Sequence, residues 1–238
     1  MILGAVLAGG CGTRMGGEVP KQFLTLCDKP VLVHTLEHFY SCPDIAKTIV
    51  TVPEDWMDFT RAMLQKHFAD CTRFTVIRGG ADRTESLLRA AEEAARLDSS
   101  DDAILVTHDA ARPLISAELI LQTVQAAAES GGATAAIPAV DTIAVSGDGK
   151  TIAFTPDRAT LWQIQTPQTF RLSLLRQTAA LLSDSERTAL TDACGIFAAR
   201  GLAVRLVSAS RNNIKLTTPG DLIFAEALLT PSNPATST

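Results

Sequence analysis

The sequence lacks the features that mark several large classes of protein. Acidic residues outnumber Lys and Arg by 26 to 21, so the chain has no basic surplus of the kind that nucleic-acid-binding domains carry. The five cysteines are an odd number and include no Cys-x-x-Cys pair, which argues against a metal site and a disulfide framework. The apolar run at residues 2–8 is too short to span a membrane and has no basic segment before it. We therefore expect a cytoplasmic protein that binds neither nucleic acid nor membrane.

What the sequence does contain is a regular alternation of apolar runs and helical patterns. A chain of 238 residues with 46% hydrophobic content can bury one large α/β core or two small ones. Strand–helix alternation predicts an α/β fold of the Rossmann-like, doubly wound kind, a mostly parallel sheet with helices on both faces. The expected strands are 2–8, 46–52, 74–77, 103–107, 203–207 and 213–216; the expected helices are 31–40, 56–68, a helix opening at 82–85, 116–130, 172–182, 189–199 and 219–229.

After residue 133 the long helical patterns give way to short β-prone segments, which predicts a projecting β-arm. Short β-prone pieces follow one another at 135–138, 142–145, 152–155 and 161–164, and the turn at 146–150 separates two of them as in a hairpin. An arm at about 139–160 would leave strand edges unpaired, and a second copy of the chain is the economical way to cover them. We expect a homodimer of single-domain subunits (residues 1–229), with a disordered tail at 230–238 that is rich in Pro, Ser and Thr.

The stretch AVLAGGCGTRMGGEVPKQF, residues 5–23, indicates a site for a polyanion. A buried strand runs into a loop with five glycines, whose backbone N–H groups can approach phosphates closely. Arg14 and Lys21 add positive charge to the same loop. The loop has no Gly-Lys-Ser/Thr of a P-loop and lacks the third glycine of a dinucleotide fingerprint, so neither of those sites is predicted.

Two further loops also follow expected strands, at residues 79–86 and 108–113. Since ligands of parallel sheets lie beyond the carboxyl ends of the strands, all three loops should meet at one edge. Asp109 in the second of these loops could bind Mg²⁺ together with phosphate oxygens and water, or it could form a salt bridge with Arg112 or cap a helix. Arg14, Lys21 and Lys215 could neutralise a triphosphate. His34 and His38 lie four residues apart on an expected helix, but no third metal ligand is evident near them.

Seven motifs in order resemble one enzyme family. They are LAGGCGTRMG…PKQF, GGADRTES, THDAARP, PAVDTI, DRATLWQIQTPQTF, LTDACG and NNIKLTTPGDL, and together they extend to about residue 229. The order is similar to that in the polyol-phosphate cytidylyltransferases, which couple CTP to a polyol phosphate and release pyrophosphate. The resemblance implies a Rossmann-like core, a Mg²⁺ or similar divalent cofactor, and a β-arm that pairs two subunits.

The resemblance also assigns roles to individual residues. It implies nucleotide binding by Ala8, Gly9, Gly10, Gly12, Arg14, Lys21, Gly80, Arg83 and Ser86, with Arg14, Lys21 and Lys215 acting in catalysis. It implies acceptor binding by Asp109, Arg112, Arg158, Thr166, Thr191 and Lys215, with Arg158 reaching across from a second subunit and Asp109 holding the metal. The acceptor phosphate would be the nucleophile, so no general base is expected.

Two subfamilies offer different acceptors, and the motifs favour the one that makes CDP-ribitol from D-ribitol 5-phosphate for wall or capsule polymers. LAGG, THDA, the helix at Trp56 and LLSDSERTALTDAC are similar to that type. The alternative makes CDP-methylerythritol for isoprenoid biosynthesis, and DRATLW and the Thr191-Asp192 pair are more similar to that one. Ala81 replaces an acidic residue common in the methylerythritol group, and no carboxylate occurs between Ser208 and Lys215 to provide a second metal ligand.

Two other classes of function remain open at this point. A dinucleotide-dependent oxidoreductase would need an acidic residue at the end of the second strand, for which Glu54 is a weak candidate. A non-catalytic nucleotide sensor could dispense with Lys21, Asp109 and Lys215, yet all three are present.

Overall fold

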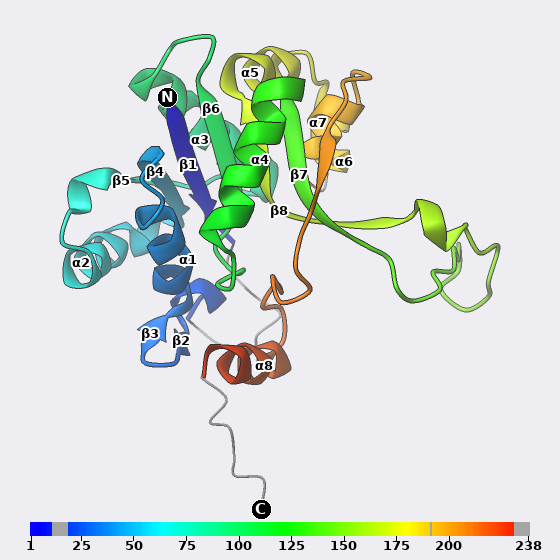
Figure 1. The fold of residues 1–238 in the computed structure, drawn as a ribbon, viewed down its shortest axis with the longest axis horizontal. Coiled ribbons are helices and arrows are strands. Elements are labelled where there is room, and N and C mark those ends of the chain that lie inside the picture. Colours follow the sequence, from blue (N-terminus) through cyan, green and yellow to red (C-terminus); the bar gives the residue numbers. More distant parts are fainter. Residues whose placement is uncertain (11–18, 191, 231–238) are drawn as a thin grey trace, which may run out of the picture.

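A seven-stranded sheet forms the centre of the protein, in a computed structural model that describes residues 1–10, 19–190 and 192–230. The strand order is β5-β4-β1-β6-β8-β7-β9, and of these seven strands only β8 runs antiparallel to its neighbours (Figure 1). The strands are β1 (Ile2–Leu7), β4 (Ile45–Val52), β5 (Phe74–Arg78), β6 (Ile104–Asp109), β7 (Gly132–Pro138), β8 (Trp162–Arg171) and β9 (Arg205–Ser208). The α/β, mostly parallel sheet predicted from the alternation is confirmed.

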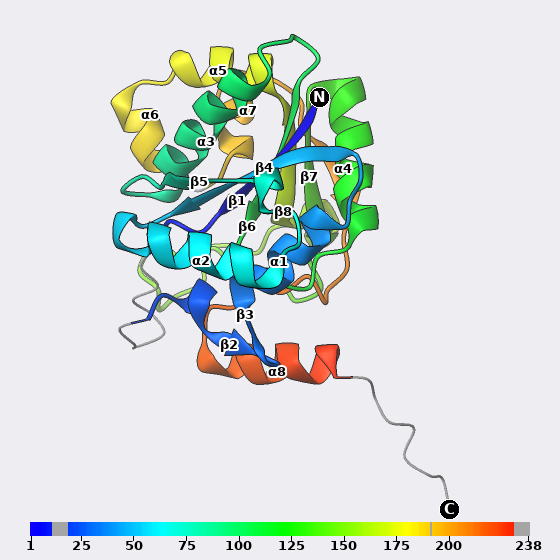
Figure 2. The same ribbon diagram turned by 90° about the vertical axis from the view of Figure 1, so that its left-hand side faces the viewer.

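Helices cover both faces of this sheet, as Figure 2 shows. One face packs α1 (Val31–Tyr40), α2 (Met57–His67) and α4 (Ala117–Ser130), and the other packs α3 (Arg83–Leu97), α5 (Leu172–Ala180) and α7 (Cys194–Ala198). In β1 the side chain of Val6 enters the first core, whereas Leu3, Ala5 and Leu7 enter the second. This alternation follows from the two-residue period of a strand and explains why a strand buried on both faces reads as one apolar run.

The register of the central strands aligns their carboxyl ends. Leu7 of β1 lies opposite Thr51 of β4 and Asp109 of β6. Arg78, the last residue of β5, lies opposite Val52. The loops that leave β1, β5 and β6 therefore begin at the same edge of the sheet, as the sequence predicted.

The C-terminal helix and a small hairpin from the N-terminal part of the chain pack together below the sheet in Figure 1. The two-stranded hairpin β2 (Thr25–Leu26) and β3 (Lys29–Pro30) shares a third apolar cluster with α8 (Pro219–Leu229). Asp221 in the first turn of α8 accepts a hydrogen bond from the Thr218 N–H at 2.7 Å, so one exposed N–H at the helix start has a partner. No helix among the described residues combines the length and apolarity that crossing a bilayer requires.

Residues 139–161 project from the body of the molecule between β7 and β8 (Figure 1). The predicted hairpin within this arm is reduced to one antiparallel bridge between Val145 and Phe154. Asp148 caps the turn, accepting from the Lys150 and Thr151 N–H groups at 2.8 Å each. The expected arm is thus present as a projection with little regular pairing of its own.

Three predicted segments differ from the structure. Residues 213–216 form no strand; their backbone has an irregular course, anchored by a hydrogen bond from Leu216 N to Ala111 O at 2.8 Å. The strand expected at 161–164 extends to Arg171, because its second half pairs with both β6 and β7. The helix expected around 189–199 is shortened to α7, and a separate short helix, α6 (Asp184–Ala189), precedes it. The tail at 231–238 lies outside the described residues.

Candidate functional site

A cavity of about 740 Å³ opens where the central strands end. Its walls come from the ends of β1, β5 and β6, from the segment before α1, and from the loop before α8. The residues that matter below are Ala8, Gly9, Gly10, Lys21, Gln22, Gly79, Gly80, Arg83, Glu85, Ser86, Asp109 and Lys215. The predicted convergence of three loops is therefore confirmed for their described parts.

The glycine-rich loop is anchored at its start by a residue that the sequence did not single out. Gln22 donates to the carbonyl of Ala8 at 2.6 Å and to that of Gly10 at 3.1 Å. Gly9 lies so close to Ser86 that a Cβ atom there would be 2.7 Å from its Oγ. A side chain at Gly9 would thus push the two loops apart. Gly12 and Arg14 lie outside the described residues.

The second loop, residues 79–82, is fixed by the first turn of α3. Ser86 Oγ accepts from Gly80 N at 2.9 Å and donates to Asp82 O at 2.8 Å. Asp82 caps the helix by accepting from Glu85 N at 2.7 Å, as its spacing predicted. The Glu85 carboxylate accepts from Ala81 N instead of Asp82 N, so the expected reciprocal pair is displaced by one residue.

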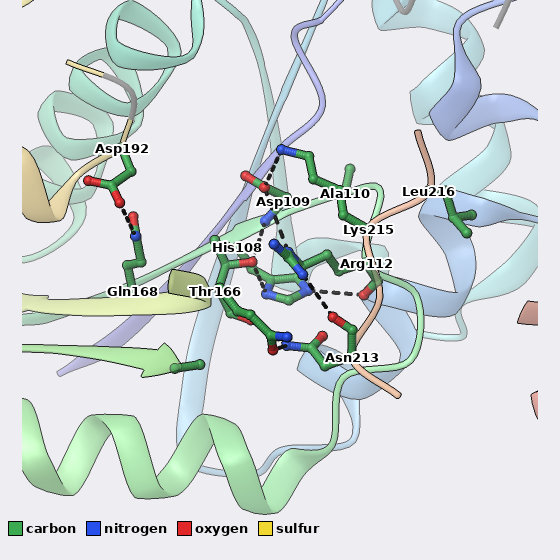
Figure 3. A network of polar contacts seen from close by, with 12 residues as sticks. His108, Asp109, Ala110, Arg112, Thr166, Gln168, Asp192, Asn213, Lys215 and Leu216 are labelled. Carbon is green, nitrogen blue, oxygen red and sulfur yellow. Dashed lines mark hydrogen bonds and ion pairs between the residues drawn. The ribbon is translucent and has the colours of Figure 1, made fainter. Parts of the chain in front are cut away.

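Asp109 is the centre of the charge network at the floor of the cavity (Figure 3). Its Oδ1 atom pairs with Arg83 Nε at 2.9 Å and its Oδ2 atom with Lys215 Nζ at 2.8 Å, while Arg112 Nε lies 3.9 Å from Oδ2. Burial by itself would raise the pKa of the Asp109 carboxyl, but the three nearby cations outweigh burial and hold that pKa well below its usual range. Asp109 is therefore an anion held among positive groups.

A second cavity of about 340 Å³ lies on the other side of Asp109. It is lined by Arg83, Asp109, Arg112, Ile164, Gln165, Thr166, Gln168, Asp192 and Lys215. Arg83, Asp109 and Lys215 belong to both cavities, so they form a shared wall. Two ligands, one in each cavity, would meet at these three side chains.

The shared wall is supported by a buried polar network from three segments of the chain (Figure 3). Thr166 Oγ1 accepts from Asp109 N at 3.2 Å and lies 2.9 Å from His108 Nδ1. The other ring nitrogen of His108 lies 3.1 Å from the Arg112 carbonyl, an acceptor, so Nε2 carries the hydrogen and Nδ1 accepts from Thr166. Burial lowers the pKa of His108 to about 3, which is consistent with a neutral ring.

Two cations attach the loop at residues 213–216 to this network. Arg112 donates to the carbonyl of Asn213 at 2.8 Å, and Lys21 donates to the carbonyl of Leu216 at 2.9 Å. These contacts explain why the segment is not a strand, since its carbonyls receive side-chain donors and its path must place Lys215 at Asp109. Burial lowers the pKa of the Arg112 guanidinium, and the charge of Asp109 partly offsets this effect.

The structure brings together most of the residues predicted for the site. Ala8, Gly9, Gly10, Lys21, Gly80 and Ser86 line the larger cavity; Arg112 and Thr166 line the smaller one; Arg83, Asp109 and Lys215 line both. Thr191 lies outside the described residues, as do Gly12 and Arg14. Arg158 lines neither of these cavities: it is exposed on the arm, where it donates to the Val140 carbonyl at 3.0 Å. Within one chain it is therefore not part of the site.

Sequence reasoning missed the buried amides. Gln168 accepts from Ala193 N at 3.1 Å and donates to Asp192 at 3.2 Å, which connects the shared wall to the start of α7. Gln165 and Asn213 bond each other at 2.8 Å. The motifs that contain these residues were recognised, but a neutral amide gives no signal by itself, because Gln and Asn occur mostly on surfaces.

Asp109 is the side chain best placed to hold a metal ion. No cluster of three His, Cys, Asp or Glu side chains with metal-binding geometry occurs within the described part of the chain. Mg²⁺ commonly takes only one or two carboxylates and completes its shell with phosphate oxygens and water. An ionised carboxylate on a wall shared by two cavities fits such a substrate-completed site. His34 uses its Nε2 atom at the Leu26 carbonyl, 2.6 Å away, which does not favour the His34–His38 pair as ligands.

Comparisons with known proteins agree with this geometry. The family model described as IspD, 2-C-methyl-D-erythritol 4-phosphate cytidylyltransferase, matches residues 2–231. A 4-diphosphocytidyl-2C-methyl-D-erythritol synthase from Anaerococcus prevotii has 27% identity and a TM-score of 0.80, with 96% of this chain and 98% of that chain covered. The 2-C-methyl-D-erythritol 4-phosphate cytidylyltransferases from Thermus thermophilus and Francisella tularensis have 29% and 26% identity, with TM-scores of 0.72 and 0.78. Both matches cover 96% of this chain, and 98% and 99% of the respective enzymes.

The comparisons favour the methylerythritol alternative and give no support to the ribitol type that the motifs favoured. For two of the four features that favoured the ribitol type, the structure shows why they do not identify the acceptor; the other two, THDA and LLSDSERTALTDAC, contain Asp109 and Asp192, which do line the smaller cavity. LAGG lies at the larger cavity, through Ala8, Gly9 and Gly10. Trp56 stacks on Phe23, with ring centroids 4.5 Å apart. Neither feature touches the smaller cavity, so neither can discriminate between acceptors bound there.

Proposed function

The chain belongs to the 2-C-methyl-D-erythritol 4-phosphate cytidylyltransferase (IspD) family of nucleotidyltransferases, and on this premise we propose that it transfers CMP from CTP to 2-C-methyl-D-erythritol 4-phosphate. The products would be the CDP-linked polyol and pyrophosphate. Family membership removes the oxidoreductase and the non-catalytic sensor from consideration. The family match and the structural neighbours, which carry this acceptor in their names, support it over D-ribitol 5-phosphate.

The observation that carries the proposal is the wall shared by the two cavities. The larger cavity has the volume and the glycine-rich lining that suit a nucleoside triphosphate. The smaller one is lined by Arg112, Lys215 and polar side chains that suit a phosphorylated polyol. Arg83, Asp109 and Lys215 stand between them. An acceptor phosphate in the smaller cavity would approach a triphosphate in the larger one at these residues.

The reaction needs positioning and charge neutralisation rather than a base. An oxygen of the acceptor phosphate, already anionic, forms a bond to the α-phosphorus of CTP as the bond from that phosphorus to the bridging oxygen breaks, and pyrophosphate leaves. Lys215 is held at the wall by Asp109, 2.8 Å away, where it would stabilise the charge that spreads over the phosphoryl oxygens. Lys21, in the larger cavity, and Arg14 would neutralise the phosphates of the nucleotide.

Mg²⁺ or a similar divalent ion is proposed as the cofactor. Asp109 would hold it, together with oxygens of the bound phosphates. When bound, the ion would supply further positive charge to the triphosphate. The lowered pKa of the Asp109 carboxyl supports this role, because the group stays ionised across the neutral range.

We also propose that the arm pairs two copies of the chain. The arm exposes apolar side chains that include Val140, Ile143, Ile152 and Phe154, of which Ile152 is 71% exposed. An apolar surface on a projection with unpaired strand edges favours burial against a partner. In such a pair Arg158, on the arm, would be available to the acceptor cavity of the second subunit.

The acceptor can be identified by turnover with two substrates. Purified protein with CTP and Mg²⁺ receives 2-C-methyl-D-erythritol 4-phosphate in one reaction and D-ribitol 5-phosphate in another. Pyrophosphate release is measured in both reactions, and the product is identified by mass spectrometry. We expect kcat/KM for the methylerythritol phosphate to be at least about tenfold higher, equivalent to the loss of one good contact. Higher kcat/KM with ribitol 5-phosphate would contradict the proposed acceptor while leaving the transfer reaction intact.

A further inference from the structure

Gln165 lines the smaller cavity, and among the described residues only the oxygen of its side-chain amide is bonded within the buried network. It lies on β8 directly before Thr166, and the residue is 7% exposed. Its Oε1 atom accepts from Asn213 Nδ2 at 2.8 Å. Its Nε2 atom has no hydrogen-bond partner among the described residues. Among the described residues, the fully buried side-chain atoms without a partner are Thr51 Oγ1, Arg112 Nε and Asn213 Oδ1. Gln165 Nε2 is not one of them, so it keeps some exposed surface, and Gln165 itself lines the smaller cavity.

The orientation of both amides follows from a single main-chain carbonyl. Thr166 O can only accept, so the Asn213 atom 2.8 Å from it must be the donor Nδ2. The same Nδ2 atom lies 2.8 Å from the Gln165 side chain, so the Gln165 atom that faces it must be the acceptor Oε1. The Gln165 NH₂ group is thereby turned away from Asn213.

This arrangement leaves one buried oxygen without a hydrogen bond among the described residues, which lowers the stability of the protein. The Asn213 Oδ1 atom is buried and lacks a partner in the described structure. A buried polar atom without a partner is destabilising, and such atoms in native proteins call for an explanation. Turning the Asn213 amide over would replace two good hydrogen bonds with oxygen–oxygen contacts at Thr166 and Gln165. The unpaired oxygen is therefore the consequence of the two bonds that Asn213 Nδ2 donates, to Thr166 O and to Gln165 Oε1, and the second of these holds Gln165 in one orientation.

We propose that Gln165 is an acceptor-binding residue that donates a hydrogen bond from Nε2 to an oxygen of the polyol phosphate, and that Asn213 is the positioning residue that sets its orientation. The inference rests on the proposed function, since it takes the smaller cavity to be the acceptor site. It adds a neutral donor to the cations Arg112 and Lys215 on the same cavity wall. A neutral donor can hydrogen-bond an acceptor oxygen without adding to the charge of the cavity.

The substitution Gln165→Glu tests the donor directly. A glutamate keeps an oxygen for Asn213 Nδ2, so the buried network retains its bonds, but it replaces the NH₂ group with an anionic oxygen. Binding of 2-C-methyl-D-erythritol 4-phosphate to the CTP-loaded protein without a divalent ion is measured by calorimetry. We expect the Kd of the acceptor to rise about tenfold or more, because a hydrogen bond is lost and a like charge is added. The Kd of CTP should stay within about twofold, since Gln165 does not line the larger cavity.

Two further variants separate this role from a structural one. Gln165→Met removes the donor without adding charge and should raise the acceptor Kd several-fold, by less than the glutamate does. Gln163→Glu places the same charge on the same strand, at an exposed residue that lines neither cavity, and should leave both Kd values unchanged. Equal acceptor binding by Gln165→Glu and the unaltered protein would overturn the proposal. So would a parallel loss of CTP affinity in Gln165→Met, which would indicate a packing role.

The result also distinguishes this inference from the proposed function. If the unaltered protein binds D-ribitol 5-phosphate and not the methylerythritol phosphate, the proposed acceptor is wrong, and the same comparison of variants is made with ribitol 5-phosphate as the probe. If neither phosphate binds, the smaller cavity is not an acceptor site and both ideas fail.

Discussion

At the scale of single residues, the site depends on one carboxylate that three cations surround. Asp109 is almost fully buried, and an isolated charge at such a position would be very costly. Arg83 and Lys215 offset that cost at 2.9 and 2.8 Å. The same contacts place Lys215 where phosphoryl transfer is proposed to occur, so Asp109, which holds Lys215 in place, would also organise the proposed chemistry.

Asp109→Asn should lower the stability of the protein at neutral pH by roughly 2 kcal/mol, because three cations lose their counter-charge. The loss should be smaller than for a fully buried pair, since Lys215 retains contact with solvent. The folded-state pKa of Asp109 is lowered, so its contribution to stability is complete above the unfolded pKa of about 4 and disappears as the pH falls below it. Chemical denaturation between pH 3 and pH 8 should show the two proteins converging only below about pH 4.

The control for this prediction is Glu92→Gln. Glu92 pairs with Arg176 at 3.1 Å on the surface, and its loss should change the stability by less than about 1 kcal/mol.

The unaltered protein and both variants should lose stability together as the pH falls from 6.5 to 4. The pKa of His108 is lowered to about 3, so the folded state binds this proton less readily than the unfolded chain does. A constant difference between Asp109→Asn and the unaltered protein down to pH 3 would contradict the assignment.

At the scale of elements, the junctions between helices and strands decide where the site residues lie. α4 is capped at its start by Ser116, which accepts from Leu119 N at 3.2 Å. It ends at Gly131, whose φ of +84° is in the left-handed region. This turn sends the chain directly into β7, which pairs with β8 and so with the strand that carries Gln165, Thr166 and Gln168.

Gly131→Ala should destabilise the protein by about 1–2 kcal/mol, the cost of a left-handed conformation for a residue with a Cβ atom. The new methyl group would also lie 2.9 Å from Leu174 Cδ2, a contact that a small movement of the leucine side chain would relieve. Gly147→Ala is the matched control. An added Cβ at Gly147 would lie in open space, and the φ of Gly147 is not in the left-handed region, so the stability of this variant should differ from that of the unaltered protein by less than about 0.5 kcal/mol. Urea unfolding of both variants measures the difference, and equal midpoints would refute the argument.

At the scale of the whole molecule, the arm extends the protein beyond its own core. It carries Arg158 and a series of exposed apolar side chains, and within one chain it makes no contribution to either cavity. This arrangement has a purpose if a second subunit covers the arm and receives Arg158. The resemblance that first suggested this role for Arg158 is thus compatible with its position far from the site of its own chain.

Mixing two inactive variants tests the exchange of Arg158 between subunits. Arg158→Ala and Lys21→Ala should each lose most of their activity alone. In a mixed dimer, the subunit that carries Arg158→Ala keeps its own Lys21 and receives an intact Arg158 from its partner, so one site is complete. Random reassortment of equal amounts makes half of the dimers mixed, and roughly a quarter of the original activity should return. An unchanged, low activity after verified subunit exchange would show that Arg158 does not act across the interface.

The fold and the location of the site could be predicted largely because they depend on local signals. Apolar runs of strand length, capping residues such as Ser116 and Asp82, and the glycine-rich loop are each visible within a few residues. The convergence of the loops after β1, β5 and β6 follows from the rule that parallel strands end at the same edge. Segments whose course depends on distant partners were predicted less well. Residues 213–216 alternate polar and apolar side chains as a half-buried strand does, yet Arg112 and Lys21 donate to carbonyls of this segment, and no strand forms.

By itself, then, the sequence determined the α/β class, the meeting of three loops at the strand ends and the family of the enzyme, because short motifs and residue periodicity carry that information. The tertiary structure decided that Asp109 is shared by two cavities, that Arg158 lies outside the site of its own chain, and that Gln165 turns its NH₂ group away from Asn213. Each of these facts depends on side chains that are far apart in the sequence, 48 residues in the case of Gln165 and Asn213. A hydrogen bond between such residues has no local pattern, and only the packed chain brings its two ends together.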